Sequence, residues 1–96
     1  MPRTIKVTAT PNSIGWICLV TVDDGGRTVS EHTVEATASD VNHLGPNSSV
    51  EDLVRRSFDF LLEREPPQSI LRRFALADIK SYFPDYPDVI RAQQRN

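Results

Sequence analysis

The sharpest polar cluster in the sequence is Glu63-Arg64-Glu65, which stands directly before Pro66-Pro67. Two carboxylates on either side of a guanidinium could form an acid–base pair, or they could dock a basic partner. Alternatively, these charges close a helix by pairing with neighbouring groups, while the apolar stem of Arg64 covers part of the core. The structural role is favoured, and Glu63, Arg64 and Glu65 remain candidate partner contacts.

A second candidate is the segment Tyr82-Phe83-Pro84-Asp85-Tyr86-Pro87, which places three aromatic rings among two prolines. Rings held by rigid backbone suit a binding surface, because little conformational entropy is lost when a partner docks. The alternative is that the rings complete the protein's own core. We expect Phe83 to belong to the core and Tyr86 to be an exposed contact, and we take both Tyr82 and Tyr86 as candidate contacts for a partner.

Basic side chains occur in three local pairs, which are Arg55-Arg56, Arg72-Arg73, and Arg91 with Arg95. If the short segments that carry them face the same side, Arg72, Arg73 and Lys80 could form a small patch for nucleic acid. Acidic residues interleave with these pairs, and no helix-turn-helix pattern is clear. A solvated surface is therefore the favoured interpretation, and Arg72 and Arg73 are kept as candidate contacts for a partner.

Potential metal ligands fall into an acidic set and a cysteine–histidine set: Asp23, Asp24 and Asp40; Cys18, His32 and His43. Neither set has the closely spaced pairs that zinc sites use or the repeated oxygen ligands of calcium loops. The first two aspartates precede Gly-Gly, which is typical of a hairpin turn. The sequence predicts no metal and no cofactor.

Enzyme motifs are also missing from the sequence, which has no G-x-S-x-G, no phosphate-binding glycine loop and no H-E-x-x-H. A small enzyme would need a cleft that gathers Glu63, Glu65 and His32 and shifts their pKa values. We therefore expect a protein without enzymatic activity and without a small-molecule substrate.

Composition sets the class of protein. The 96 residues are 39% hydrophobic and 25% charged, which is ordinary for a globular chain, and the net charge of −2 gives no general field for nucleic acid. The lone Cys18 cannot form an internal disulfide. The chain starts with an alternating strand pattern instead of a signal-peptide pattern, and its apolar runs are too short for a membrane span. We expect a cytoplasmic protein with no membrane contact.

The first part of the chain carries strand patterns. Residues 4–10 alternate between apolar and polar types, which predicts an edge strand. Residues 14–22 are apolar on both faces, which predicts a central strand covered on both sides. Asp23-Asp24-Gly25-Gly26 predicts a tight hairpin into a third strand over 27–38, with His32 facing inward. Three strands joined in this way form an antiparallel meander.

A loop is expected over 40–47, followed by one long helix from Ser49 to about Arg64. Ser48 and Glu51 fit a capping box at its start. Its apolar stripe is wide, so the helix needs contacts on two sides, from the sheet and from either the C-terminal helices or a second subunit. The stripe comprises Val50, Leu53, Val54, Phe58, Phe60, Leu61 and Leu62.

Prolines divide the rest of the chain into short pieces. Pro66 ends the long helix, and Gln68–Phe74 is predicted as a short helix with Ile70 and Leu71 inward. Further turns of helix are expected over 77–83 and 88–93.

Together these elements predict an α+β fold: a three-stranded antiparallel meander packed by one long helix and followed by two or three short C-terminal helices. We expect one domain over 1–96, with the meander in 1–40, a helical half in 48–93 and a frayed tail at 94–96.

The helical half resembles a group of short stand-alone prokaryotic proteins that have no assigned activity. The resemblance covers about residues 48–90 and is carried by FLLEREP (60–66), SIL (69–71), Phe74, Ile79 and YFP (82–84). It implies fold, size and a prokaryotic origin, and it transfers no catalytic residue. The order of three strands and a helix is also similar to the N-terminal half of HicB-type antitoxins, in architecture alone.

The function expected from the sequence is contact with protein, either self-association or binding to a partner. The wide stripe of the long helix and the open edge at residues 4–10, which could pair with a symmetry mate, both favour it. The alternative is an antitoxin-like or regulatory protein that binds a cognate toxin or nucleic acid.

Overall fold

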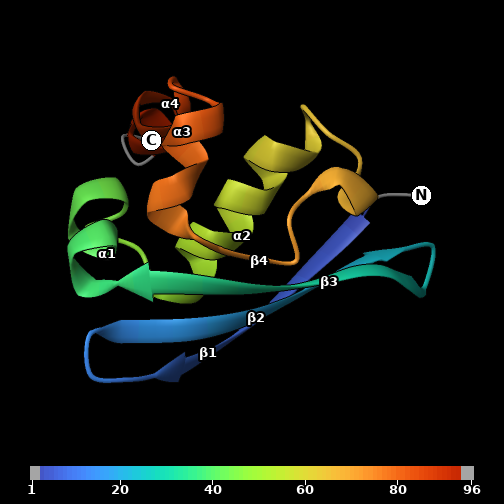
Figure 1. Ribbon diagram of the computed structural model, residues 1–96, viewed down its shortest axis with the longest axis horizontal. Helices are drawn as coiled ribbons and strands as arrows, with labels where there is room; N and C mark the ends of the chain where they lie inside the picture. Colours follow the sequence, from blue (N-terminus) through green and yellow to red (C-terminus); the bar gives the residue numbers. More distant parts are fainter. Residues whose placement is uncertain (1–2, 94–96) are drawn as a thin grey trace.

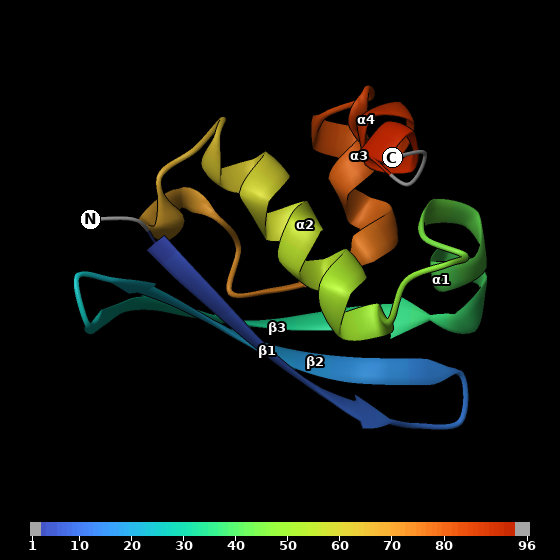
Figure 2. The same cartoon turned by 180° about the vertical axis from the view of Figure 1, so that it is seen from behind.

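The computed structural model describes residues 3–93, so the tail predicted to fray at 94–96 lies outside the described residues. Its helices lie on one face of a single sheet, as the opposite views in Figures 1 and 2 show. The α+β class predicted from the sequence is confirmed. The elements in chain order are β1 (Arg3–Pro11), β2 (Gly15–Asp24), β3 (Arg27–Thr37), α1 (Ala38–Leu44), α2 (Val50–Leu62), the 3₁₀ turn η1 (Pro67–Ser69), β4 (Arg73–Ala75), the 3₁₀ turn η2 (Leu76–Asp78), α3 (Ile79–Tyr82) and α4 (Tyr86–Gln93).

The antiparallel meander of β1, β2 and β3 is present as predicted, in that order across the sheet. Gly25 and Gly26 form the turn between β2 and β3 with φ of 62° and 84°, a left-handed conformation that suits glycine. The meander places Val20 opposite Val7 on one side and His32 on the other. Its inward residues form the floor of the core.

The prediction that β2 is covered on both faces is wrong. Cys18, Val20 and Val22 are buried under the helices, whereas Leu19 on the opposite face is 56% exposed. Register places Leu19 between Thr8 of β1 and Thr33 of β3. The outer face of the sheet is open because the helices pack on the other one.

The sheet has a fourth strand, so the prediction of a three-stranded sheet is wrong. β4 pairs with β3 in parallel, with Phe74 beside Val34. The short helix predicted over Gln68–Phe74 is therefore wrong as well: it is reduced to η1, and the chain after it is extended. Its apolar spacing also suits a helix, but the free edge of β3 supplies backbone partners that a short helix cannot replace.

Part of the loop predicted over 40–47 is the helix α1, which begins at Ala38 and thereby ends β3. Thr37 caps it: the Asp40 backbone N–H donates to the Thr37 hydroxyl, and the Thr37 N–H donates to the Asp40 carboxylate, both at 3.0 Å. This reciprocal capping box uses aspartate in place of the more familiar glutamate.

The long helix α2 is confirmed, but it starts one residue later than predicted and ends at Leu62. Ser49 is the N-cap, because its hydroxyl accepts from the Asp52 N–H at 3.1 Å. The capping box predicted at Ser48 is therefore wrong; the Ser48 hydroxyl instead accepts from Arg56 at 2.9 Å.

The wide apolar stripe of α2 is covered on both sides by the chain itself. One side packs on the sheet, where Phe58 lies against His32 and Phe74. On the other side, Phe60 makes edge contacts with Phe83 and Tyr86. The stripe thus needs no second subunit, and its width does not by itself support partner binding.

No helix within residues 3–93 is both long and apolar enough to cross a membrane.

Candidate functional site

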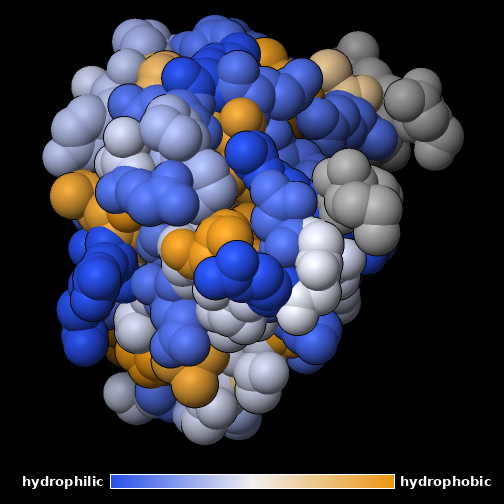
Figure 3. All heavy atoms as spheres, turned by 90° about the vertical axis from the view of Figure 1, so that its right-hand side faces the viewer, coloured by the Kyte–Doolittle hydropathy of each residue, from blue (hydrophilic) through white to orange (hydrophobic). Residues whose placement is uncertain are grey.

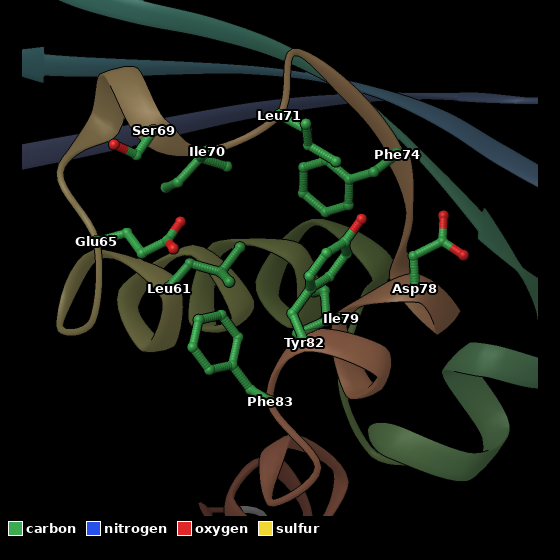
Figure 4. A pocket seen from close by; sticks show the side chains of 10 residues that line it. All are labelled: Leu61, Glu65, Ser69, Ile70, Leu71, Phe74, Asp78, Ile79, Tyr82 and Phe83. Atoms are coloured by element: carbon green, nitrogen blue, oxygen red, sulfur yellow. The ribbon is translucent and has the colours of Figure 1, made fainter.

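A groove opens where the end of α2 faces the η1–β4 segment and α3 (Figure 4). Leu61, Ile70, Phe74 and Ile79 form its apolar floor, and each of them belongs to the core. The cavity has a volume of about 160 Å³. Its walls are therefore continuous with the packed interior of the protein.

The rim of the groove carries large apolar side chains that the fold leaves exposed. Leu71 is 53% exposed and Tyr82 is 66% exposed, on opposite walls. Figure 4 shows the Tyr82 ring reaching toward Leu71 and Phe74. Together they extend the apolar floor to the surface.

Hydrogen bonds to the backbone carbonyls of Leu71 and Arg72 hold this wall of the groove against β3. The His32 ring is buried, and its Nδ1 lies 2.8 Å from the Leu71 carbonyl oxygen. A carbonyl only accepts, so Nδ1 is the donor; in the neutral ring, Nε2 then accepts from the Ser30 hydroxyl at 2.9 Å. The Thr33 N–H donates to the Arg72 carbonyl at 2.7 Å. The groove is preformed on this side.

The opposite wall is fixed by the turn before α3. The Asp78 carboxylate accepts from the Ala75 N–H at 3.1 Å, which closes η2. Phe83 follows α3 and meets Phe60 edge-on, with 5.8 Å between the ring centroids. The wall that carries Tyr82 is thereby anchored at both ends.

The structure separates the predicted Glu63-Arg64-Glu65 cluster. Glu65 lines the groove, whereas Glu63 is exposed outside it. The Arg64 guanidinium turns away, lying 3.6 Å from the centroid of the Phe60 ring and donating to Asp85 at 3.1 Å. The cluster therefore contributes only the Glu65 carboxylate to the groove. Arg64 packs on Phe60, and Glu63 lies on the exposed surface.

The structure does not bring Glu63, Glu65 and His32 into one cleft. Glu65 lines the groove, Glu63 does not, and both ring nitrogens of His32 lie within hydrogen-bonding distance of oxygen atoms of the fold. The three-residue cleft that a small enzyme would need is not formed.

The prediction that Tyr86 is an exposed contact is wrong. Tyr86 is 1% exposed, its hydroxyl lies 2.7 Å from that of Ser57, and its ring packs edge-on against Phe60. Phe83, predicted as core, is partly buried and packs against the core. Of the predicted aromatic contacts, Tyr82 is the exposed one.

The predicted basic residues lie on different surfaces. Arg73 points to the outer face of the sheet, where it lies 3.7 Å from Glu35. Arg72 is exposed but does not line the groove. Lys80 lines a second hollow of about 430 Å³ between α1, α3 and α4, together with His43 and Arg91. Arg72, Arg73 and Lys80 therefore do not share one concave site.

The clearly shifted pKa values belong to other regions. Burial raises the pKa of Cys18 to about 11 and that of Tyr86 to about 12. Burial also raises the pKa of Asp59. Burial also favours a higher pKa at Asp52, but the hydrogen bonds from Arg56 and Arg55 outweigh it, so the pKa of Asp52 is lowered. These shifts arise from packing and ion pairing along the fold.

Within residues 3–93, no group of three or more His, Cys, Asp or Glu side chains is gathered closely enough to hold a metal ion. The two histidines lie in different surroundings: His32 is buried in the core, and His43 lines the second hollow.

Comparison with known proteins gives no match to a family model, a curated protein or a solved structure. The site therefore has to be interpreted from its own chemistry.

Sequence reasoning missed the roles of two residues that shape the groove, Leu71 and Asp78. It placed His32 inward correctly but did not identify the Leu71 carbonyl as its partner. Leu71 was placed inward because the segment was taken as a helix, whereas the extended chain turns it outward. The available signal was Phe74 between Arg73 and Ala75, and three residues are too few to distinguish a strand from a helix by periodicity. No local signal shows that His32 contacts a carbonyl 39 positions away.

Proposed function

We propose that the protein acts by binding another protein, and that the groove between α2, β4 and α3 is the contact surface. The observation that carries this proposal is the pair of exposed apolar side chains, Leu71 and Tyr82, on a preformed apolar cavity. They are two of the four large hydrophobic side chains exposed in the described part of the chain, and they lie at one site. Aromatic and aliphatic groups around a pocket are typical of interface anchors.

The size of the cavity favours a protein segment over a small molecule. Sites for small molecules and cofactors usually have volumes of about 300–1,000 Å³. The groove has about 160 Å³, close to the size of a cavity that holds a single benzene ring. One apolar side chain fits this volume, with the rest of the partner lying across the rim.

Rigid walls also support the proposal. The Leu71 backbone is held by His32, and the Asp78 side chain closes the turn before α3. A preformed surface loses little entropy on binding, so a small contact gains more affinity than a flexible one of equal area.

The end of the molecule that carries the β2–β3 turn differs from the groove. Figure 3 shows the described residues of that face as mostly hydrophilic, with hydrophobic residues in small separate patches. Scattered apolar atoms of this kind are usual on a protein surface.

Self-association through β1 is the alternative mode of protein contact. β1 is the outer strand of the sheet, as expected for residues 4–10. However, α2 lies beside this edge, where Glu51 and Asp52 line a hollow with Ile5 and Val7. Arg55 lines the same hollow and pairs with Asp52, so the charges here are mixed, and the first turn of α2 shields this edge from an added strand by covering it. The groove is therefore the better supported surface.

The antitoxin-like or regulatory alternative makes a different prediction. Binding to nucleic acid weakens steeply as salt rises, because cations are released from the phosphates. Contact through an apolar groove depends far less on salt. A cognate toxin would be a protein partner and would occupy the groove.

The test is purification of the tagged full chain from its native host at low and high salt, with mass spectrometry of what remains bound. A stoichiometric protein is expected at both salt concentrations. Leu71→Ser should abolish its binding, and so should Tyr82→Ala. The matched control is Leu19→Ser, because Leu19 is similarly exposed, at 56% against 53% for Leu71, but lies on the outer face of the sheet.

Equal capture by the Leu71→Ser and Leu19→Ser variants would exclude the groove. Recovery of nucleic acid that leaves as salt rises would replace the proposal with the regulatory alternative. Circular dichroism of each variant establishes that it is folded before the capture is compared.

A further inference from the structure

We infer that the groove selects a partner segment in which one apolar side chain is flanked by basic residues, one on either side. This inference rests on the proposed function and adds the chemistry of the partner. It follows from the position of the charges around the apolar floor.

The charged side chains lining the groove, among the described residues, are both acidic: Glu65 and Asp78. Figure 4 shows them at opposite ends of the cavity, with Leu61 and Tyr82 between them. An apolar side chain seated in the centre would therefore have a carboxylate near each of its chain neighbours. Complementary charge at the rim of an interface sets the partner and its orientation.

Both carboxylates are available to a partner. Glu65 is half-buried, and the described part of the chain offers its carboxylate neither an ion pair nor a hydrogen bond. Asp78 uses Oδ2 to accept from the Ala75 N–H, which leaves Oδ1 for a ligand. The side chain of Asp78 is exposed, so a cation reaches it without displacing the fold.

The basic residues nearest in sequence do not neutralise this charge within the groove. Arg64 lies over Phe60 and pairs with Asp85, and Arg73 lies near Glu35 on the sheet. Neither Arg72 nor Lys80 lines the cavity. A bound segment that carries lysine or arginine supplies the missing positive charges.

Tyr82 also favours a positively charged partner. Its ring is 66% exposed on the rim between the two carboxylates, and aromatic faces attract lysine and arginine. Acidic or phosphorylated segments and nucleic acid are disfavoured, because they would place negative charge beside Glu65 and Asp78.

The experiment selects binders to the purified full chain from a random dodecamer peptide library displayed on phage. The expected consensus has one Leu, Ile, Met or Phe with Lys or Arg within a few positions on both sides. A synthetic consensus peptide is then titrated by fluorescence anisotropy. We expect Leu71→Ser to weaken its binding about tenfold or more and Leu19→Ser to leave it unchanged.

Charge variants test the inference itself. Glu65→Gln and Asp78→Asn should each weaken binding about two- to fivefold and reduce its salt dependence, and the double variant should combine both losses. Asp78→Asn keeps an oxygen that accepts from the Ala75 N–H, so η2 is preserved. The matched control is Glu63→Gln, which removes an exposed acidic charge near Glu65 but outside the groove.

The outcomes separate the inference from the proposed function. A consensus that is apolar without basic residues, with binding lost in Leu71→Ser but kept in Glu65→Gln, would overturn the inference and leave the groove in place. Binding that is equal in Leu71→Ser and Leu19→Ser would overturn the proposed function as well. A concentration-dependent dimer that Leu71→Ser abolishes would identify a second copy as the occupant and would also overturn the inference.

Discussion

Tyr82 ends α3 and Tyr86 begins α4, only four positions later. They mark two regions along α2, one of which is closed to solvent and the other open. At Tyr86 the flank of α2 is closed: the ring packs on Phe60, and the hydroxyl reaches Ser57 at 2.7 Å. At Tyr82 the flank is open, and 66% of the residue faces solvent above an apolar floor. The fold buries the Tyr86 ring and gives its hydroxyl a hydrogen-bond partner. The same fold leaves Tyr82 exposed at the groove.

The helix α2 therefore contributes to stability on one flank and to the groove on the other. In the closed region the Tyr86 ring packs on Phe60 and its hydroxyl forms a buried hydrogen bond with Ser57. A substitution there should lower the free energy of unfolding. The open region uses side chains that the fold does not need to cover. Substitutions should therefore divide into those that change stability and those that change binding.

The largest expected effect contrasts Phe58 with Tyr82. Phe58 is fully buried between the rings of His32 and Phe74, so Phe58→Ala should leave a cavity and lower the free energy of unfolding by about 3–5 kcal/mol. Tyr82→Ala should change it by about 0.5 kcal/mol or less, since the residue is mostly exposed. Urea unfolding monitored by circular dichroism measures both. Near-wild-type stability of Phe58→Ala would contradict the packing of α2 on the sheet.

Alkaline pH should destabilise the closed region through Tyr86. Burial raises the pKa of Tyr86 to about 12 from its ordinary value of 10.0, while the Ser57 hydrogen bond opposes the shift. Between these values the unfolded chain loses the phenolic proton before the folded one does, so stability falls as pH rises. The loss is about 2–3 kcal/mol, complete near pH 12, and is absent below about pH 10.

The control for this prediction is Tyr86→Phe, which has no phenolic proton. The pH dependence of unfolding in urea should be smaller in Tyr86→Phe than in the wild type over that window. Cys18, whose pKa burial raises to about 11, contributes to both proteins and cancels in the comparison. Identical pH profiles would mean that Tyr86 titrates as an exposed tyrosine and is not enclosed.

The features predictable from the sequence are those decided by neighbouring residues. Gly25 and Gly26 specify a tight turn by themselves, and the spacing of apolar residues from Val50 onward specifies α2. In both cases the local preference and the final packing agree. The order of the meander follows directly from such short connections.

The features that could not be predicted depend on partners far along the chain. Ile70, Leu71 and Phe74 suit a short helix, but the segment becomes extended because β3 offers its edge, as the Thr33–Arg72 hydrogen bond shows. The burial of Tyr86 depends on Ser57, 29 positions earlier. The groove exists because β4 and α3 diverge from α2, so its acidic rim was visible in the sequence only as separate residues.

A smaller effect isolates the hydroxyl of the buried tyrosine at neutral pH. Tyr86→Phe should lower the free energy of unfolding by about 1 kcal/mol, because it removes one buried hydrogen bond while Ser57 still donates to the Leu53 carbonyl. Tyr82→Phe removes the same atom from an exposed ring and should have no measurable effect. The two variants are compared by thermal unfolding. A larger loss in Tyr82→Phe would reverse the assignment of the closed and open regions.

The smallest expected effect concerns Arg64, which lies between the two regions. Its guanidinium covers the Phe60 ring at 3.6 Å and pairs with Asp85, whereas Arg91 pairs with Asp88 at 3.0 Å on the exposed surface of α4. Lysine keeps the charge but loses the planar stacking, so Arg64→Lys should cost about 0.5–1 kcal/mol and Arg91→Lys close to zero. Chemical unfolding of both variants measures the difference. Equal effects would show that Arg64 is an ordinary surface charge, and the boundary between the closed core and the open groove would then rest on the aromatic rings alone.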